Sequence, residues 1–408
     1  MLTPARKHLR TLSSALLLAL GCNGLPEAGS SEDLTQEVEQ RLASPLHTSM
    51  VLFDGGTNGF HSFRIPSIIR TNAGTLLAFA EGRKYNDDDF GDINLVYRRS
   101  TNHGATWSAL GEVEGVGPGT WGNPTAVLDA RNGRVWLFMS WNSGTTNQNG
   151  TNGYKKIDTW GERRVYVTYS DNDGVTWSTP KDLTSTLVPP NYAWDAVGPG
   201  VGIQTKGGPH PGRLIIPAIG RNIYSDDGGT TWKYKLIPAG TSEGTVVELL
   251  NGQLMRNDRG STLWEANKRR MVSTGSLEGG FSSWSADPKL LDPRCEGSII
   301  RYNTDAPSRI MFLNPASTEG RCKMRVRISY DEGRTWNDAQ SRRIHETLTD
   351  EQTCEQGRGG YSSMTKTADY AVAALIERNE NVGGNPSHRS IEFHKFNLPW
   401  ILNGASEP

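Results

Sequence analysis

The chain has 408 residues and a formal net charge of −1, from 43 Lys and Arg and 44 Asp and Glu. The basic residues are dispersed along the chain, which excludes the concentrated positive patch typical of nucleic-acid binding, and we expect no nucleic-acid partner. Its 46 glycines and 12 tryptophans suit many short strands joined by tight turns around a sizeable core.

The N-terminal segment is predicted to direct export. Three basic residues precede an apolar run at 12–20 that is too short for a stable bilayer anchor, which is typical of a signal peptide over residues 1–22. A small residue before Cys22 resembles a bacterial lipoprotein cleavage site, at which Cys22 is lipidated; the alternative is an ordinary secretory signal. The polar residues 23–46 predict a flexible tether. We therefore expect an exported bacterial protein, attached to the cell surface or outer membrane by a lipid anchor, or otherwise secreted or periplasmic.

Short β-rich runs recur in six groups along the rest of the chain. They lie within 67–99, 126–170, 200–220, 245–259, 296–316 and 360–377, and a last run follows at 390–397. Regular short strands with turn signals favour a propeller or a sandwich, and six groups of about four strands favour the propeller. We therefore predict one all-β domain at 47–403, a six-bladed β-propeller of four-stranded antiparallel blades whose ring is closed by the last run, and a short tail at 404–408.

One turn sequence occurs four times between these runs. Each copy begins with Ser, has Asp or Asn two residues later, and ends in Gly, a variable residue, Thr and Trp. The Asx side chain caps the turn, Gly adopts a positive φ, and Thr and Trp begin the next strand with the indole packed between sheets. The copies are 100–107, 170–177, 225–232 and 329–336.

An arginine stands at the start of the first predicted strand, in the tetrapeptide Phe63-Arg64-Ile65-Pro66. A charged side chain among apolar neighbours is costly to desolvate unless an anion meets it. Arg83 follows, and then a loop at 87–92 with four Asp in six residues, which by itself predicts a solvated loop or, more weakly, a cation site.

Two β-rich runs joined at Asn251-Gly252 predict a β-hairpin. Such a hairpin brings Glu243 and Arg259 to the same end, although they are sixteen residues apart in the chain. Glu248 and Arg256 form the alternative pair on the same hairpin.

Two further residues precede and follow the last repeated turn. Arg321 lies eight residues before it, whereas Arg325 and Arg327 alternate along the next strand and are predicted to be surface or packing residues. Tyr361 opens the final group in Gly360-Tyr361-Ser362-Ser363. A tyrosine at such a position would by itself predict a core residue.

Beyond Cys22 the chain has three cysteines, an odd number for an oxidising compartment. We expect one disulfide, between Cys322 and Cys354, because both lie in a segment that would otherwise be a long loop; a pairing with Cys295 stays open. The sequence has no CxxC and no pair of histidines at ligand spacing, so we expect no metal site and no cofactor.

These motifs, taken in order, resemble those of the Asp-box (BNR) sialidases, bacterial exo-α-sialidases of glycoside hydrolase family 33. The repeated turns resemble Asp boxes, with Asn102 and Asn172 in place of the usual Asp in two of them. The resemblance covers about residues 50–398 and implies a six-bladed propeller that removes terminal α-linked sialic acids from glycoproteins, glycolipids and oligosaccharides. Asp boxes also occur in propellers with other functions, so this implication depends on the other motifs.

The resemblance assigns an anion-binding role to three arginines. In that family three guanidiniums clamp the carboxylate of sialic acid, and the matching positions are Arg64, Arg259 and Arg321. Arg presents planar bidentate donors, and each hydrogen bond to a charged group contributes ~1.5 to 3 kcal/mol. Arg83 resembles a further pocket arginine, the alternative being a surface charge. Asn123 stands where relatives have an Asp that meets a sugar hydroxyl, although a plain turn fits it equally well.

The resemblance also assigns catalytic residues: Tyr361 as nucleophile, Glu243 as its base and Asp89 as general acid, with Asp88 the nearest competitor. A phenol suits this substrate, because a carboxylate attacking at about 4 Å would meet about 4 kcal/mol of repulsion at an effective dielectric of about 20. That repulsion corresponds to roughly a thousandfold in rate. The expected reaction is hydrolysis with retention through a tyrosyl intermediate.

Two alternatives remain besides hydrolysis. A trans-sialidase needs an acceptor site that excludes water, which one sequence does not reveal. A non-catalytic sialic-acid-binding propeller is disfavoured, because Tyr361, Glu243 and a loop acid are all present. We expect sialylated glycoconjugates as partners and a monomeric protein.

Overall fold

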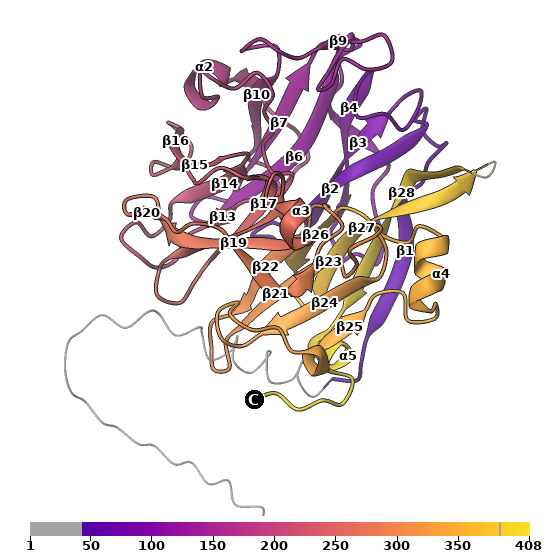
Figure 1. Ribbon diagram of the computed structural model, residues 1–408, viewed down its shortest axis with the longest axis vertical. Helices are drawn as coiled ribbons and strands as arrows, with labels where there is room; N and C mark the ends of the chain where they lie inside the picture. Colours follow the sequence, from indigo (N-terminus) through magenta and orange to yellow (C-terminus); the bar gives the residue numbers. More distant parts are fainter. Residues whose placement is uncertain (1–42, 383–384) are drawn as a thin grey trace, which may run out of the picture.

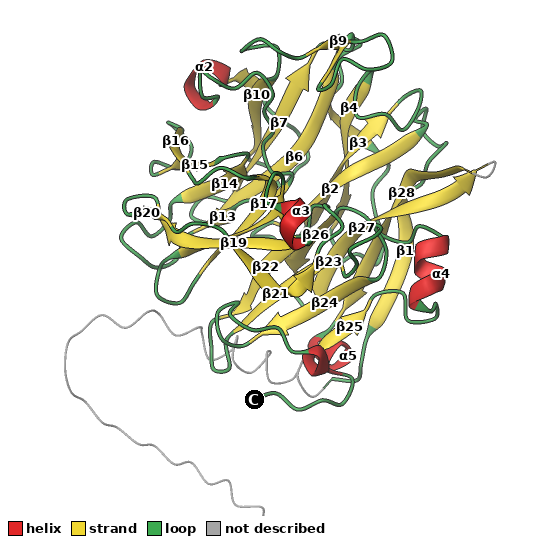
Figure 2. Cartoon of the chain, viewed as in Figure 1, coloured by secondary structure: helices red, strands yellow, loops and turns green. Residues whose placement is uncertain are grey.

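The computed structural model describes residues 43–382 and 385–408, which form an all-β propeller with a few short helices in its loops (Figures 1 and 2). The predicted signal peptide, Cys22 and all but the last residues of the predicted tether lie outside the described residues. Within the described part, no helix has the length and apolar character needed to cross a membrane.

The two ends of the folded chain meet in one sheet, in the order β1–β28–β27–β26 (Figure 1). Its strands are β1 (His47–Phe53), β26 (Ser362–Lys366), β27 (Val372–Val382) and β28 (Asn385–Phe396). Strand β1 pairs antiparallel with β28, from His47 opposite Phe396 to Phe53 opposite Ile391. The last β-rich run thus closes the ring by pairing with the N-terminal strand.

A nine-stranded sheet holds the first half of the fold, in the order β11–β10–β7–β6–β4–β3–β2, with β12 on β6 and β5 on β4. Its strands are β2 (Ser62–Arg70), β3 (Leu76–Arg83), β4 (Ile93–Ser100), β5 (Gly111–Glu114), β6 (Thr120–Asp129), β7 (Arg134–Asn142), β10 (Arg164–Ser170), β11 (Lys181–Asp182) and β12 (Gly200–Val201). Strands β4 and β6 are joined through one parallel pair, Ile93 with Thr120. The hydrogen bonds therefore do not divide this half into the predicted four-stranded sheets.

Three more sheets complete the ring, with orders β13–β14–β15–β16, β17–β18–β19–β20 with β21 on β19, and β22–β23–β24–β25. The strands of the first are β13 (Ile203–Gln204), β14 (Leu214–Ala218), β15 (Arg221–Ser225) and β16 (Lys233–Leu236). Those of the second are β17 (Thr241–Glu248), β18 (Leu254–Gly260), β19 (Arg269–Ser276), β20 (Gly280–Phe281) and β21 (Ser285–Leu291). Those of the third are β22 (Ser298–Asn303), β23 (Arg309–Pro315), β24 (Met324–Ser329) and β25 (Ser341–Arg343).

The remaining elements are short and lie in connections. They are the parallel pair β8 (Thr146–Asn147) and β9 (Lys155–Lys156), the helices α2 (Thr184–Leu187), α3 (Trp264–Asn267), α4 (Asp350–Glu355) and α5 (Leu398–Leu402), and a 3₁₀ turn at Asp338–Gln340. Helix α4 begins in a capping box, in which Thr349 and Gln352 each bond the other's backbone N–H. This cap stabilises a helix where the sequence analysis expected a long loop.

The repeated turns share one hydrogen-bond pattern whether they carry Asn or Asp. In the first, Oδ1 of Asn102 accepts from the backbone N–H of Thr106 at 2.9 Å, and Nδ2 donates to the Thr106 hydroxyl at 2.8 Å. In the last, Oδ1 of Asp331 accepts from the N–H of Thr335 at 2.9 Å, and Oδ2 accepts from the Thr335 hydroxyl at 2.7 Å. Asn is therefore a sound replacement, because the threonine hydroxyl can either accept or donate.

The tryptophans that end these turns pack against neighbouring strands across the sheets. The ring of Trp107 lies edge-on to Phe393 of β28 at 5.1 Å, and that of Trp232 edge-on to Phe138 of β7 at 4.7 Å. Such aromatic pairs add roughly 0.5–1.5 kcal/mol to the burial of their surface. The repeats therefore stabilise the packing of one sheet on the next.

Two contacts fix the C-terminal third of the fold. A disulfide joins Cys322 to Cys354, with Cα atoms 4.8 Å apart, and ties the segment before β24 to helix α4. The predicted tail is also held, because Glu407 forms an ion pair of 2.5 Å with the buried Arg309. Cys295 is a buried free thiol.

Candidate active site

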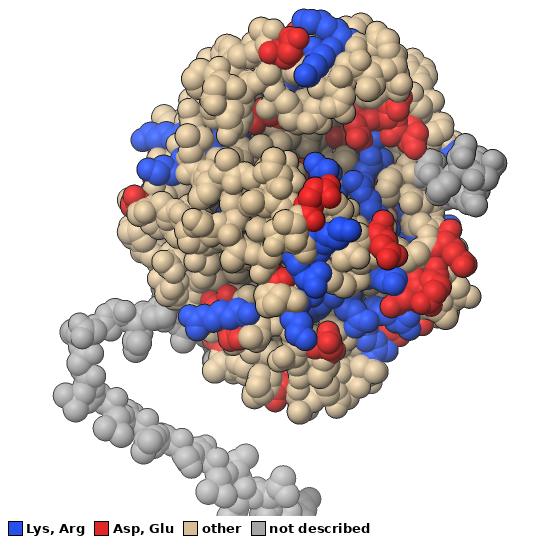
Figure 3. All heavy atoms as spheres, in the orientation of Figure 1, with Lys and Arg blue, Asp and Glu red and all other residues tan. Residues whose placement is uncertain are grey.

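A cavity of about 650 Å³ contains the residues that the sequence analysis placed in a site. They are Arg64, Arg83, Asp88, Asp89, Asn123, Glu243, Arg259, Arg321 and Tyr361. Figure 3 shows one face of the molecule, hollowed and bordered by both basic and acidic side chains. The lining residues come from strands and loops of several sheets, so the closed ring brings together positions that are up to about three hundred residues apart.

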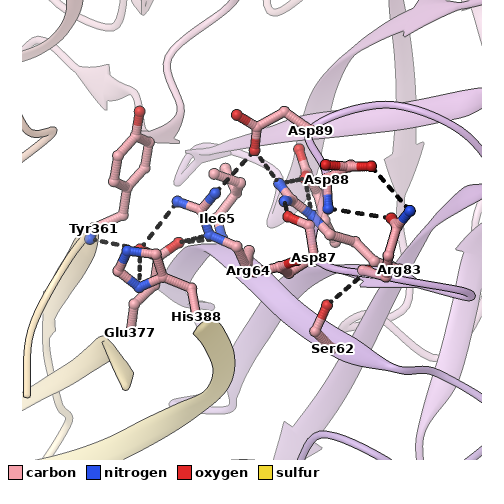
Figure 4. Close-up of polar contacts among 12 residues, drawn as sticks. Ser62, Arg64, Ile65, Arg83, Asp87, Asp88, Asp89, Tyr361, Glu377 and His388 are labelled. Atoms are coloured by element: carbon pink, nitrogen blue, oxygen red, sulfur yellow. Dashed lines mark hydrogen bonds and ion pairs between the residues drawn. The ribbon is translucent and has the colours of Figure 1, made fainter. Parts of the chain in front are cut away.

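Arg64 is aimed by an irregularity in β2. The register of β2 against β3 shifts between Arg64 and Ser67, and Ile65 has φ of 57°, a backbone conformation that is rare for a β-branched residue. The Arg64 guanidinium donates to Glu377 of β27 at 3.1 and 3.3 Å and to Asp89 at 2.8 Å (Figure 4). The bulge therefore places a buried cation at the side of the cavity.

Glu377 is a site residue that the sequence analysis missed. Its carboxylate is fully buried and also accepts the backbone N–H groups of Ile65 and Tyr361, each at 3.0 Å. Burial opposes its ionisation, but Arg64, and after it His388, outweigh burial and hold the Glu377 pKa well below its usual range. Burial lowers the pKa of His388 to about 3, so this imidazole is neutral. Glu377 thus orients the first arginine and the backbone of Tyr361 together.

Asp89 lies against two of the arginines of the cavity. Its Oδ1 is 2.8 Å from both Arg64 Nη1 and Arg83 Nη2, while 72% of its side chain is exposed (Figure 4). Desolvation of the carboxylate acts to raise its pKa, but Arg83 and Arg64 prevail and keep the pKa of Asp89 below its usual range. Asp88 instead bonds Asn86 at 2.9 Å, and burial raises its pKa. An exposed loop carboxylate therefore holds the position where an anionic ligand would meet these guanidiniums.

Tyr361, Glu243 and Arg259 form a short polar cluster on the cavity floor. The Tyr361 hydroxyl donates to the Glu243 carboxylate, whose oxygens lie 2.7 and 2.6 Å away, and accepts from Arg259 Nη1 at 2.6 Å. Arg259 also pairs with Glu243 Oε2 at 2.5 Å. Burial raises the pKa of Tyr361 well above its usual value, although Arg259 acts against this. The phenol is therefore neutral and already bonded to a base.

Among the three arginines expected to bind a carboxylate, Arg321 differs from Arg64, which pairs with Glu377, and from Arg259, which pairs with Glu243. Its guanidinium carbon lies 5.0 Å from the centre of the Tyr361 ring, and that of Arg64 lies 5.5 Å from it. Within the described residues, no carboxylate pairs with Arg321 by a hydrogen bond or ion pair. Three guanidiniums thus surround one phenol, and an anionic ligand is the counter-ion that this arrangement favours.

The wall beside Arg83 is a second group of buried polar residues. Arg83 bonds Glu81 Oε2 at 2.6 Å, and Glu81 Oε1 accepts the backbone N–H of Asn123 at 3.0 Å. The Asn123 side chain accepts from Arg163 at 2.7 Å, and the Arg163 guanidinium lies over Trp194 at 4.7 Å. Burial lowers the pKa of Arg163 to about 10. Arg163 was missed because it stands at the start of a strand with no motif around it.

The alternative pair on the hairpin lies elsewhere. Arg256 bonds Asp258 at 2.9 Å with both side chains fully buried. Glu248 accepts the backbone N–H of Lys206 at 2.7 Å and that of Gly207 at 2.9 Å. Neither Arg256 nor Glu248 lines the cavity, so the structure brings Glu243 and Arg259, rather than this pair, to the site.

Comparison with known proteins identifies the family of this chain. Residues 74–372 match the family model described as a BNR repeat-like domain. An exo-alpha-sialidase of Aspergillus fumigatus is 47% identical over 396 residues, covering 90% of this chain and 94% of the relative. The chain belongs to the sialidase family. A second exo-alpha-sialidase of this family, from Arthroderma benhamiae, is 48% identical over 367 residues, covering 85% of this chain and 86% of the relative.

Solved structures of sialidases show the same fold. The Hadza microbial sialidase Hz136 superposes with a TM-score of 0.70 and 24% identity, over 86% of this chain and 68% of that chain. The intramolecular trans-sialidase from Ruminococcus gnavus has a TM-score of 0.72 and 18% identity, over 88% and 99%. These likenesses confirm the predicted all-β propeller. The related sialidases include fungal and bacterial proteins, so the bacterial origin of this one stays a prediction.

Proposed function

We propose that this protein is an exo-α-sialidase that hydrolyses terminal α-linked sialic acids of glycoproteins, glycolipids and oligosaccharides, with retention through a tyrosyl intermediate. The observation that carries the proposal is the cluster on the cavity floor, where the Tyr361 hydroxyl lies 2.6 Å from both Glu243 Oε2 and Arg259 Nη1. A neutral nucleophile with its own base, among three guanidiniums, suits a substrate whose anomeric carbon bears a carboxylate.

Substrate binding is proposed to begin with an exchange of anions. The substrate carboxylate takes the guanidiniums of Arg64, Arg259 and Arg321, and Asp89 gives up its ion pair with Arg64. Because Arg83 and, after it, Arg64 keep the pKa of Asp89 low, loss of the Arg64 ion pair shifts this pKa upward. The exchange thereby couples binding of the substrate to a higher pKa of Asp89, the proposed general acid.

The chemical steps follow from the contacts of Tyr361. Its oxygen attacks the anomeric carbon while its proton passes to Glu243, and Asp89 protonates the leaving glycosidic oxygen. Water, deprotonated by Asp89, then attacks the same carbon, and Tyr361 leaves as its oxygen recovers the proton from Glu243. Two inversions give net retention, and both acid and base return to their starting states.

The propeller is proposed to have six blades. In the described part of the chain, the sheet pairing between β4 and β6 consists of one pair, Ile93 with Thr120, so the nine-stranded sheet is best counted as two blades, β2–β5 and β6, β7, β10 and β11. The sheets β13–β16, β17–β21, β22–β25 and β26–β28 with β1 supply the other four.

Export stays a proposal drawn from the N-terminal sequence alone. The signal at 1–22, lipidation of Cys22 and the tether are proposed on that basis, and a monomeric state is proposed separately. Mass spectrometry of the mature N-terminus tests the first two, since lipidation adds acyl chains to Cys22, whereas an ordinary secretory signal leaves an unmodified end.

Release of 4-methylumbelliferone from its α-sialoside tests the activity, with protein lacking residues 1–22. We expect turnover by the wild type and a loss of at least about a thousandfold in Tyr361→Phe, since the nucleophile is removed. Tyr330→Phe is the matched control, because the Tyr330 hydroxyl also bonds a glutamate, Glu407, at 2.9 Å but lies outside the cavity. Sialic-acid binding without turnover by the wild type would leave a lectin-like propeller. Transfer to added lactose in place of hydrolysis would identify a trans-sialidase.

A further inference from the structure

A second group of polar side chains lies outside the catalytic cavity, where the ring closes. His345 Nε2 is 2.9 Å and His394 Nε2 3.3 Å from the same oxygen, Glu392 Oε2. The three donor atoms all lie within 4.8 Å of one another. His345 and Glu392 have side chains that are 12% exposed, and His394 is buried. None of the three lines the catalytic cavity.

The three residues come from two neighbouring sheets. Glu392 and His394 stand two apart on β28 and therefore point to one face of that strand. His345 follows β25, the outer strand of the adjacent sheet. Strand β28 is also the strand that pairs with β1 to close the propeller. Anything that binds all three residues would fasten the closing sheet to its neighbour.

The donor set and two of its three separations match a transition-metal site. Two imidazole nitrogens with one carboxylate oxygen, and a fourth position open to water, is a donor set that zinc takes. Tetrahedral ligands at the usual zinc bond lengths lie about 3.3 Å apart, close to the separations of Glu392 Oε2 from the two nitrogens. Calcium would instead need oxygen ligands.

A third histidine, His47, lies within hydrogen-bond distance of the proposed ligand His394. His394 Nδ1 lies 3.1 Å from Nε2 of His47, on β1. An imidazole nitrogen with a free lone pair can accept an N–H, so His47 Nε2 can accept a hydrogen bond from His394 Nδ1. Metal-ligating histidines commonly donate their second N–H to such an acceptor, which fixes the ring.

Two arginines share the carboxylate without covering the donor oxygen. Arg358 and Arg378 contact Glu392 through its other oxygen, Oε1, at 3.4 and 3.3 Å. They fix the orientation of the carboxylate and leave Oε2 facing the histidines. Their positive charge opposes a dication, so the site should bind more weakly than a four-ligand structural zinc site.

We propose that His345, Glu392 and His394 bind a divalent cation of the zinc type, which ties the closing strand β28 to the neighbouring sheet. The site is separate from the catalytic cavity, so its occupancy should act on stability and leave the chemistry of sialoside cleavage unaltered.

Zinc titration of the metal-free protein, with any histidine tag removed, tests the site. We expect one Zn²⁺ per chain by isothermal titration calorimetry, a higher Tm with zinc than with EDTA, and no response to Ca²⁺. Co²⁺ should give the visible absorption of a four- or five-coordinate site with nitrogen ligands. Loss of one ligand in His345→Gln should weaken zinc binding by at least about tenfold.

His210→Gln is the matched control, because His210 also contacts a glutamate, Glu278, at 3.2 Å but lies far from the cluster in the fold. Unchanged zinc binding in this control and weakened binding in His345→Gln would support the site. Equal binding by the wild type and His345→Gln, or no stoichiometric binding by the wild type, would overturn it. If His345→Gln fails to fold, His47→Gln, which keeps all three ligands, should still weaken binding by about tenfold.

Discussion

Strand β18 carries the arginines of two arginine–carboxylate pairs that differ in their surroundings. Arg256 and Asp258 bond at 2.9 Å with both side chains fully buried, whereas Arg259 and Glu243 bond at 2.5 Å with 20% and 14% of their side chains exposed. Burial raises the pKa of Asp258 despite its arginine. The first pair is closed off by protein, and the second opens on the cavity beside Tyr361. The difference indicates that burial, rather than residue type, separates a pair that holds the fold from one that is available for chemistry.

Breaking the fully buried pair of Arg256 and Asp258 should have the largest effect on stability. Arg256→Met leaves Asp258 buried without its partner, which should lower the free energy of unfolding by about 3–5 kcal/mol. Urea denaturation measures this loss. The folded fraction should keep kcat/KM within about twofold of the wild type, and a large fall in kcat/KM at full stability would contradict the structural role of Arg256.

Breaking the pair of Arg259 and Glu243, which faces the cavity, should lower activity more than stability. Arg259→Met removes hydrogen bonds to the substrate carboxylate worth ~1.5 to 3 kcal/mol each, so kcat/KM should fall by about a hundredfold to a thousandfold. The free energy of unfolding should fall by less than in Arg256→Met, since Arg259 and Glu243 are partly exposed whereas Arg256 and Asp258 are fully buried. Steady-state kinetics and urea denaturation of one preparation decide between this outcome and a shared structural role for both arginines.

For a third pair, Arg64 with Glu377, the pH dependence of the free energy of unfolding provides the test. The Glu377 pKa is lower in the folded protein than its ordinary value of 4.5, so ionised Glu377 stabilises the fold above about pH 4.5. This contribution is lost as the pH falls below 4.5 toward the folded-state pKa. The difference in unfolding free energy between the wild type and Glu377→Gln should therefore be about 2 kcal/mol and constant at neutral pH, and should shrink on acidification. If this difference instead grew as the pH falls, it would contradict a lowered pKa of Glu377 in the folded protein.

An exposed pair should give the smallest effect and completes the series. Arg134 bonds Asp171 at 2.6 Å with 29% and 56% of the side chains exposed. Asp171→Asn should change the free energy of unfolding by about 0–1 kcal/mol, because water and salt screen surface pairs. Thermal unfolding at low and high ionic strength measures it, and any difference should vanish in high salt. A loss as large as that of Arg256→Met would mean that burial does not rank these pairs.

Residues close in sequence, or joined by a recognisable turn, could be predicted well. The Asp boxes and the strands around them depend on local turn chemistry, and Glu243 and Arg259 meet because a two-stranded hairpin fixes their register. Arg64, Arg321 and Tyr361 were found by their motifs, and the structure places them on one cavity.

Contacts that depend on closure of the ring, or on the fold of an irregular loop, could not be predicted. Glu377 lies 313 positions from Arg64, and the hydrogen bond between them depends on how β27 packs against β2. Asp89 was expected as an acid, yet its pairing with Arg64 and Arg83 follows from the fold of a loop. Ligand spacing along the chain gives no sign of the proposed metal site, because His345 and His394 come from different sheets.

The sequence by itself determined the strands, the turns between them and the family motifs, since these depend on side-chain alternation and short-range hydrogen bonds. The tertiary structure decided which charged groups are buried together, how the sheets join at β4 and β6, and which pairs face the cavity. The physical reason is that desolvation and ion pairing depend on distances between residues remote in sequence, and those distances are set only once β1 pairs with β28 and the ring is closed.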